Sequence, residues 1–243
     1  MSERAPPRLY VTPALGAGAR LTLSPEQSHY LANVMRRGVG DEVLLFNGRD
    51  GEWRGQITEK TKRAVTLDLV GQTRAQDAPG DVWLMFAPIK RQRVDFIAEK
   101  AAEMGASRLL PVITHRTNAE RVNVERLRAH AIEAAEQCGI LNVPEVDAPQ
   151  RLDAVLAAWP QSRKILFCDE EGTAPPAAET LARETRGAWA VLIGPEGGFD
   201  EEERAVLRAL PQAVAVSLGP RILRADTAAV AALALFQAAL GDW

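Results

Sequence analysis

The sequence has few of the residues that build metal centres and disulfide frameworks. It contains two cysteines and three histidines in 243 residues, and the histidines have no spacing typical of zinc ligands. Cys138 and Cys168 lie far apart in the chain, which favours two buried free thiols in a reducing compartment. We therefore expect neither a disulfide nor a bound metal.

Long apolar runs are also missing. No stretch is long and apolar enough to span a membrane, and the start, "MSERAPPRLYVTP", has no apolar core of the kind that marks a protein for export. The hydrophobic content of 47% is ordinary for a protein with a packed core. These features predict a cytoplasmic protein without a membrane partner.

Two phosphate-binding patterns are absent as well. The sequence has neither G-x-x-x-x-G-K-[ST] nor G-x-G-x-x-G, which argues against a nucleoside triphosphate and against a dinucleotide cofactor.

The net charge of −3 says little about function, but the charge is distributed unevenly along the chain. Residues 1–130 carry 20 Lys and Arg against 15 Asp and Glu, whereas residues 131–243 carry 9 against 17. A basic front half permits contact with a polyanion such as RNA.

Residues 8–70 read as short strands separated by turns, which predicts a small β-rich barrel or sandwich. "NGRDG" (47–51) is typical of a hairpin, because its glycines tolerate positive φ. One helix is expected at 24–36, with Ser24 as its N-cap and Pro25 at its first position. The polar segment 71–80 is a plausible linker.

After Asp81, apolar strands alternate with helices, which predicts a parallel α/β sheet covered on both faces. Gly105 and Gly139 are placed to end two of these helices. The last helix, "ADTAAVAALALFQAAL", is apolar on almost every side. Such a helix is buried, either in the core or against a second copy of the chain.

Three unusual loops follow strands: "FCDEEG" (167–172), "IGPEGGF" (193–199) and "SLGPRILR" (217–224). In an α/β sheet, ligands bind at the carboxyl ends of the strands, so these loops are expected to form the site. Asp200 and Glu203 have capping-box spacing at the helix that follows the second loop, so its start would repel an added phosphate. A neutral or cationic ligand held by backbone groups fits better, and S-adenosylmethionine is one. Taken alone, "GPEGG" is better explained as a tight strand–helix connection that binds nothing.

The two C-terminal motifs together give a more specific indication. "LIGPEGGFDEEE" followed by "SLGPRILRADTA" resembles the SPOUT methyltransferases, and in particular the ribosomal RNA small subunit methyltransferase E family. "RQRVDFIAEKAAEMGA", "PVITHRT", "AIEAAEQCG" and "HYLANVMRRGVGDEVLLFNGRDGEW" extend the resemblance over nearly the whole chain. Two positions depart from the family pattern. Asp226 replaces the usual Glu, and Ile140 stands where a basic residue is common.

The resemblance implies a fold and an activity. The expected fold is a PUA-like RNA-binding β-barrel over residues 1–72 and a SPOUT domain over 81–243, whose parallel sheet contains a deep trefoil knot. The expected reaction is methylation of N3 of a uridine in 16S ribosomal RNA of the small subunit, with S-adenosylmethionine as cofactor. A homodimer, with the active site near the subunit interface, is also implied.

The site residues follow from the motifs and the resemblance. The predicted cofactor-binding residues all lie in or beside the three loops and are Phe167, Cys168, Ile193, Gly194, Pro195, Gly197, Gly198, Ser217, Leu218, Gly219, Ile222 and Leu223. Arg224 is the favoured group for stabilising the charge that develops on the uracil, with Arg221 as the second candidate. Each could instead pair with Glu196 or Asp226. Glu196 could act as a base, orient an arginine, or only hold its own loop.

The predicted RNA-binding residues are Arg8, His29, Arg36, Arg37 and Arg54 in the front domain, with Lys90 and Arg93 extending the basic surface. For any single arginine, a solvated surface position is the simpler interpretation. Two other functions remain open. One is an RNA-binding protein of the same fold that has lost catalysis, and the other is an enzyme that methylates a small molecule.

Overall fold

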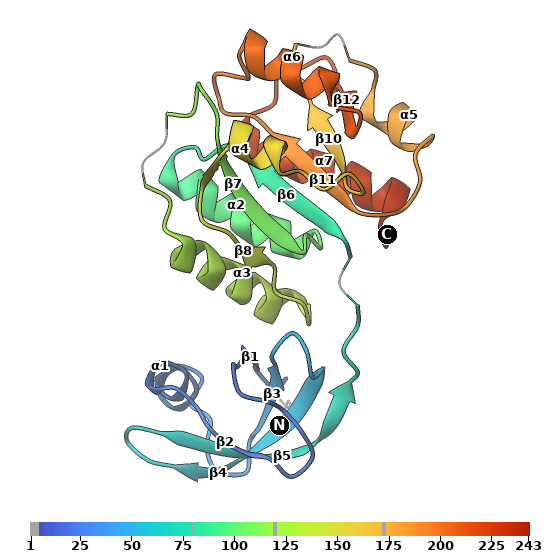
Figure 1. Ribbon diagram of the computed structural model, residues 1–243. Coiled ribbons are helices and arrows are strands. Elements are labelled where there is room, and N and C mark those ends of the chain that lie inside the picture. Colours follow the sequence, from blue (N-terminus) through green and yellow to red (C-terminus); the bar gives the residue numbers. More distant parts are fainter. Residues whose placement is uncertain (1–4, 79, 119–120, 172–173) are drawn as a thin grey trace. The chain divides into compact units, whose positions relative to one another are not determined.

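The computed structural model describes residues 5–78, 80–118, 121–171 and 174–243 (Figure 1). The chain forms two compact units. One comprises Met1–Ala78 with Ala135–Asn142, and the other comprises Pro79–Ala134 with Val143–Trp243. The short segment 135–142 therefore belongs to the N-terminal unit. The sequence had suggested a second domain that is continuous from residue 81.

The first unit is built on a five-stranded sheet in the order β1-β3-β4-β5-β2. The strands are β1 (Arg8–Tyr10), β2 (Arg20–Thr22), β3 (Glu42–Phe46), β4 (Glu52–Lys60) and β5 (Val65–Arg74). β1 pairs with β3 in parallel, and the other pairs are antiparallel. The predicted hairpin connects β3 and β4, with Gly48 and Gly51 at φ of 79° and 78°. The core of the first unit contains Leu31, Val43 and Leu67, which are all fully buried.

The helix expected at 24–36 is confirmed only in its first part. Ser24 caps α1 (Pro25–His29) by accepting a hydrogen bond from the amide of Gln27. From Tyr30 to Val34 the chain continues as a π-helix, η1, and Arg36 then takes a left-handed conformation with φ of 54°. A left-handed residue ends a helix, because its backbone can no longer continue the right-handed hydrogen-bond ladder. The segment is therefore shorter and more irregular than one α-helix.

Arg8 fixes segment 135–142 to the rest of the first unit. Its guanidinium pairs with Glu52 (Nε to Oε2, 2.7 Å) and donates to the carbonyls of Ala135 (2.6 Å) and Ile140 (3.1 Å). The side chains of Arg8 and Glu52 are only 13% and 5% exposed. All three guanidinium nitrogens are therefore used inside the unit. The prediction that Arg8 contacts RNA phosphate does not fit this position.

The second unit contains a parallel sheet in the order β12-β10-β11-β6-β7-β8, and β9 also pairs with β7. Its strands are β6 (Val82–Phe86), β7 (Arg108–Ile113), β8 (Glu145–Val146), β9 (Gln150–Arg151), β10 (Lys164–Cys168), β11 (Trp189–Ile193) and β12 (Ala213–Val216). The predicted parallel α/β sheet is confirmed. The strand order is not the chain order, because β12 lies outside β10 while β11 lies inside it.

Helices cover both faces of this sheet (Figure 1). They are α2 (Arg91–Glu103), α3 (Val124–Cys138), α4 (Leu152–Ala157), α5 (Ala177–Leu181), α6 (Glu201–Ala209) and α7 (Ala225–Leu240). Residues of α2, α5 and α7 share one core with Leu84 and Phe86 of β6. Residues of α4 and α6 share the other core with Met85, since successive side chains of a strand point to opposite faces. Burial on both faces explains why the strands read as continuous apolar runs.

The last helix, α7, is buried on one side. Ala229, Leu233 and Phe236 lie in the core, whereas Val230 and Leu235 are only half-buried. It packs against α2, α5 and β11. Leu235 still packs against this core, so the apolar surface of α7 that the core leaves unexplained includes Val230 but not Leu235. Among the described helices, α7 included, none combines the length and the hydropathy needed to cross a membrane.

Candidate active site

The three loops that follow β10, β11 and β12 surround one cleft in the second unit. Its volume is about 1050 Å³, at the upper end of the range for small-molecule sites. The start of α7 and Arg93 of α2 complete its wall. The expectation that the ligand site lies at the carboxyl ends of the strands therefore matches a real cavity.

Most of the predicted cofactor-binding residues line this cleft, and they are Cys168, Ile193, Gly194, Pro195, Gly198, Ser217, Leu218, Gly219, Ile222 and Leu223. The candidate catalytic residues Glu196, Arg221 and Arg224 line it too. Phe167 and Gly197 do not. Phe167 is fully buried on the opposite face of the sheet, where its ring packs against Phe199 at 5.2 Å. Gly197 instead accepts a hydrogen bond on its carbonyl from Arg116 (3.0 Å).

The loop that follows β11 is closely packed at two of its glycines. At Gly194, an added Cβ would lie 2.7 Å from the Phe199 ring. Gly198 has φ of 68°, and an added Cβ there would collide with the carboxylate of Glu170. At Gly197 the nearest atom to such a Cβ is a side-chain carbon of Arg116 at 3.7 Å, an ordinary contact. Of the adjacent glycines Gly197 and Gly198, only Gly198 has a left-handed backbone conformation that favours glycine.

The loop after β10 is held by a cluster of ionised groups. Arg204 of α6 reaches Asp169 (3.2 Å), Glu170 (2.5 Å) and Glu171 (2.7 Å), and its side chain is 8% exposed. Arg208 adds a second contact to Asp169 at 2.6 Å. Glu170 also accepts a hydrogen bond from the amide of Phe199 (3.1 Å). The loops that follow β10 and β11 are thus tied to each other and to α6.

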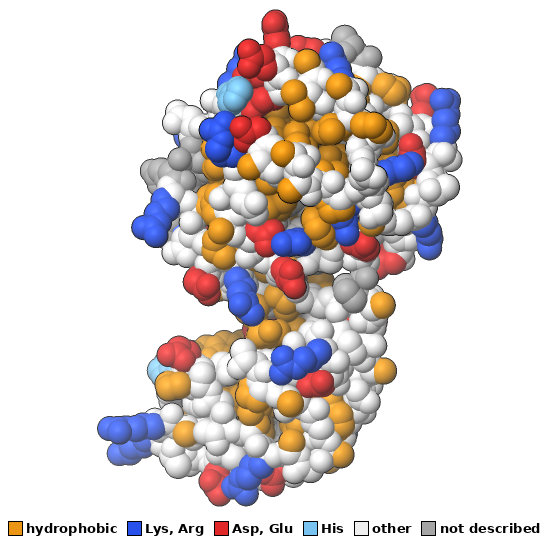
Figure 2. Space-filling model, viewed as in Figure 1, with side chains coloured by type: hydrophobic (Ala, Val, Ile, Leu, Met, Phe, Trp, Pro, Cys, Tyr) orange, Lys and Arg blue, Asp and Glu red, His pale blue; other side chains and the backbone are white. Residues whose placement is uncertain are grey.

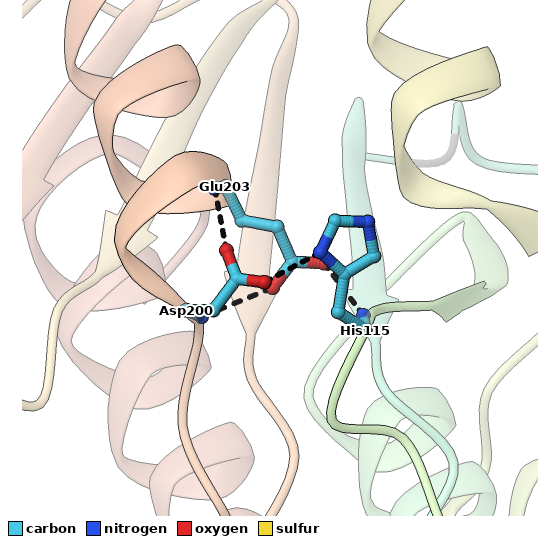
Figure 3. Close-up of side chains that lie close together, drawn as sticks. All are labelled: His115, Asp200 and Glu203. Atoms are coloured by element: carbon cyan, nitrogen blue, oxygen red, sulfur yellow. Dashed lines mark hydrogen bonds and ion pairs between the residues drawn. The ribbon is translucent and has the colours of Figure 1, made fainter.

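The start of α6 is closed by the predicted capping box. Asp200 accepts from the amide of Glu203, and Glu203 accepts from the amide of Asp200. Their remaining carboxylate oxygens bind His115 of the loop after β7: Asp200 lies 2.5 Å from Nδ1, and Glu203 accepts from the backbone amide (2.8 Å) (Figure 3). Because each of the four oxygens already has a partner, this cluster is built as a helix cap. The capping box uses the amides of Asp200 and Glu203, and the acidic side chains of the first turn would repel a phosphate here.

His115 and Asp200 influence each other's ionisation. The hydrogen bond to Asp200 raises the pKa of His115, and the carboxylate charges of Asp200 and Glu203 act in the same direction. The pKa of Asp200 is lowered, first by the amide of Glu203 and then by His115. The sequence did not reveal this contact, because His115 lies far from Asp200 in the chain.

Arg93, which the sequence predicts to contact RNA, belongs to a network of ion pairs on the cleft wall. Arg93 lies 2.5 Å from Glu196 and 3.7 Å from Asp226. It therefore belongs to the cleft and pairs with both acids that had been considered as partners for Arg221 and Arg224. Within the described part of the chain, neither Arg221 nor Arg224 forms an ion pair, and both are exposed. Two guanidinium groups at the cleft are thus available to a ligand.

Cys168 lines the cleft without being a nucleophile. Burial raises the pKa of its thiol to about 12, so the thiol stays protonated near neutral pH. The buried side chain contributes a small apolar surface to the cleft wall.

The remaining RNA candidates occupy different surroundings. His29 is exposed, and its Nδ1 lies 2.9 Å from the Asn33 amide nitrogen. Arg37 donates to the carbonyl of Ala5 (2.8 Å), whereas Arg36 is exposed and Lys90 precedes α2. Arg54 pairs with Glu42 at 3.6 Å on the surface.

Comparison with known proteins identifies the family. Residues 76–237 match the family model described as an RNA methyltransferase domain, and residues 23–70 match the RNA methyltransferase PUA domain. The ribosomal RNA small subunit methyltransferase E of Synechocystis is 33% identical over 240 residues, which cover 96% of this chain and 78% of that protein. The chain belongs to the ribosomal RNA small subunit methyltransferase E family. The member from Rickettsia conorii is 29% identical over 93% of both chains.

Two solved structures resemble the chain over nearly its whole length. The ribosomal RNA small subunit methyltransferase E of Neisseria gonorrhoeae, bound to S-adenosyl methionine, has a TM-score of 0.87 at 28% identity, with 98% of this chain and 99% of that chain covered. A methyltransferase from Legionella pneumophila, in complex with SAM, has a TM-score of 0.88 at 28% identity and covers 99% and 100%. The fold of the family therefore extends through both units of this chain.

The two adjacent glycines of the GPEGG loop provide a matched pair of variants. Gly198→Ala should lower the free energy of unfolding by about 1–2 kcal/mol, because it places a side chain in a left-handed conformation against Glu170. It should also weaken S-adenosylmethionine binding, since the displaced Glu170 lines the cleft. Gly197→Ala should change neither value. Thermal unfolding and calorimetric titration would measure both, and an unaltered Gly198→Ala would show that the loop geometry does not shape the site.

The contact between His115 and Asp200 predicts a pH-dependent contribution to stability. Folding raises the pKa of His115, so the contact stabilises the folded state fully when the pH is below the pKa of an unfolded histidine, about 6.5. This stabilisation is lost as the pH rises through the pKa of His115 in the folded state. His115→Ala should therefore lower the free energy of unfolding at about pH 5.5 more than at about pH 9. Denaturant unfolding across this range would measure the difference. In an Asp200→Asn background the pH dependence should become smaller, with the charge of Glu203 still contributing, and an undiminished pH dependence there would assign it to another group.

Proposed function

We propose that the chain transfers a methyl group from S-adenosylmethionine to N3 of one uridine in 16S ribosomal RNA of the small subunit. The observation that carries this proposal is a cleft at the carboxyl ends of β10, β11 and β12 in a chain of this family. Relatives with the same fold are named for ribosomal RNA methylation or were solved with the cofactor. We expect the reaction in the cytoplasm.

The residues present suit this cofactor. Its adenine can be bound by backbone groups of the glycine loops, and its cationic centres suit a wall that contains Glu170 and Glu196. The closed start of α6 offers no anion site, which agrees with a ligand that carries no phosphate. When bound, S-adenosylmethionine supplies an electrophilic methyl carbon attached to a sulfonium. The cofactor contacts are proposed for the ten predicted residues that line the cleft.

The chemistry at the base requires loss of a proton. N3 of uridine becomes nucleophilic when its proton leaves, and the negative charge then spreads over N3, O2 and O4. A C–N bond forms as the C–S bond breaks, and the electron pair of the broken bond goes to sulfur. A guanidinium beside the uracil oxygens would stabilise the charge in a site that excludes water. Arg224 and Arg221 are the unpaired guanidinium groups that can do this.

Glu196 is best placed to orient an arginine. Its carboxylate faces Arg93 at 2.5 Å, and Arg93 also approaches Asp226. We propose that Arg93 fixes Glu196 and Asp226, so that neither neutralises Arg221 or Arg224. This assigns Arg93 to positioning at the cleft and no longer to RNA phosphate.

Two features of the architecture are part of the proposal. We infer that the loops around β10, β11 and β12 form a trefoil knot, which is supported by the placement of β12 outside β10 and the return of α7 to pack on β11. We also infer a homodimer through α7, because Val230 on this apolar helix is only partly buried and lies outside the core cluster of the chain. Light scattering should then give twice the mass of one chain.

For RNA, the proposal keeps the predicted residues of the first unit that have no carboxylate partner among the described residues. His29, Arg36 and Arg37 are proposed to bind the substrate, with Lys90 adding positive charge from the second unit. Arg54 is retained only as a weaker candidate, because Glu42 already lies 3.6 Å from it.

The function itself can be tested directly. The protein should methylate 16S ribosomal RNA in small subunits when S-adenosylmethionine is present, and digestion followed by mass spectrometry should find one methyl on N3 of a single uridine. Methyl transfer to free uridine would favour the small-molecule enzyme. Cofactor binding without any transfer would favour the non-catalytic RNA-binding protein, and a methyl at carbon or ribose would overturn the assignment to N3.

The role of Arg224 predicts a kinetic signature. Arg224→Lys keeps the charge but loses the planar fork that can face two oxygens. It should slow single-turnover methyl transfer, by less than the roughly 10²–10³-fold cost of removing a whole donor, and leave both substrate affinities nearly unchanged. Raising the pH should reduce the deficit, because more uridine then ionises without help.

Arg221→Lys is the matched control for this variant. Both residues are exposed, lie in the same loop and line the same cleft. The control should cost less in rate. If Arg224→Lys reacts as fast as the unaltered protein, or its deficit is independent of pH, another group stabilises the charge.

A further inference from the structure

The first unit contains a cleft of its own. It has a volume of about 960 Å³ and lies between the α1–η1 segment and the turn that joins β4 to β5. The polar and exposed residues of its lining that bear on a ligand are His29, Asn33, Val39, Lys60, Lys62 and Arg63. None of these lining residues is acidic, and three are Lys or Arg. The whole lining falls within residues 23–70, the region that matches the PUA domain of RNA methyltransferases.

Cations elsewhere on this unit are paired with acids. Arg20 lies 2.5 Å from Glu59, and Arg49 lies 3.7 Å from Asp50. Both arginines are more than half exposed. Such surface pairs contribute little to stability, but they neutralise the charge that a polyanion would meet.

The cations of the cleft differ from these. Among the ion pairs of the described residues, none involves Lys60, Lys62 or Arg63, although Lys62 and Arg63 are exposed. Figure 2 shows Lys and Arg side chains projecting from the tip of the ribbon formed by β4 and β5. Glu59, next to Lys60, points to the other face of the strand and pairs with Arg20, because side chains alternate along a strand. Uncompensated positive charge is therefore concentrated on one side of this turn.

Lys60 connects the two walls of the cleft. Its ammonium donates to the carbonyl of Arg37 (2.8 Å) and approaches that of Ala32 (3.5 Å). This contact holds the end of η1, and with it the exposed Arg36, beside the β4–β5 turn. Lys60 is thus held at the cleft by backbone carbonyls, which leave its charge without a carboxylate partner among the described residues.

We propose that this cleft holds a segment of single-stranded RNA, with its phosphates at Lys62 and Arg63 and a base against His29. The assignment rests on the proposed RNA substrate and names the surface that receives it. Cations track a nucleic-acid backbone, and an imidazole ring offers a face for base stacking. Asn33 adds an amide that can bind a base edge, and Val39, which is 65% exposed, adds apolar surface. The concave form and these polar groups favour an RNA strand over a flat membrane surface.

The test compares two variants that lose the same charge. Lys62→Ala/Arg63→Ala should weaken binding of a 16S ribosomal RNA transcript. It should also lower the slope of log affinity against log salt by about 1.4, since each lost contact to single-stranded RNA contributes about 0.7. Arg20→Ala/Arg49→Ala removes two exposed arginines that are already paired, and it should leave the slope nearly unchanged. The charge-keeping exchange Lys62→Arg/Arg63→Lys should retain most of the affinity.

Each outcome decides for or against the cleft. An unchanged slope for Lys62→Ala/Arg63→Ala overturns the proposal, and so does an equal loss in both double variants, because that would reflect net charge alone. Loss of binding to anionic lipid vesicles with RNA binding intact would assign the surface to a membrane. The proposed reaction can fail without the assignment of RNA to the cleft failing. If the unaltered protein binds RNA through the cleft but transfers no methyl, the proposed function falls and the cleft assignment stands.

Discussion

Arg204 is the group on which the arrangement of the second unit depends most. Its side chain is buried among three carboxylates of the loop after β10, and Asp169 among them is fully buried. A buried charge that loses its partner costs about 3–5 kcal/mol, so neither side of this contact can be removed freely. The contact fixes α6 against the loop, and Glu170 then reaches the amide of Phe199. The walls of the cleft are consequences of this pairing.

The same region decides which ligands the cleft can accept. Asp200 and Glu203 cap each other's amides at the acidic start of α6, and His115 binds the carboxylate oxygens that remain. A glycine loop that would otherwise suit phosphate is therefore closed to anions. Across the cleft, Arg93 pairs with Glu196 and Asp226, and within the part of the chain that the structure describes Arg221 and Arg224 form no ion pair. The acids that line the cleft are thus paired with arginines, whereas Arg221 and Arg224 of the cleft have no ion-pair partner among the described residues.

The first unit shows the same separation of paired and unpaired charge. Arg8 is used entirely in fixing segment 135–142, and Arg20 is neutralised by Glu59. Lys62 and Arg63 keep their charge beside a cleft. A count of arginines in the sequence cannot distinguish these uses, because they depend on which acids and carbonyls the fold brings near.

The sequence by itself determined the features that depend on near neighbours. These include the hairpin at Gly48 and Gly51, the capping box of α6, the parallel sheet and the three loops at its carboxyl edge, because periodicity and turn chemistry act over a few residues. It also identified the family, through two motifs whose combination is specific. It misplaced part of the helix at 24–36, since the left-handed Arg36 has no signal of its own.

Only the tertiary structure decided the partners of side chains far apart in the chain. It moved Arg93 from the RNA surface to the cleft, withdrew Arg8 from the solvent, and turned Phe167 to the opposite face of the sheet. It also brought His115 to Asp200. The physical reason is that an ion pair or a ring contact is chosen by distance in space. Strand order and loop path set that distance, and the sequence pattern around each residue does not contain it.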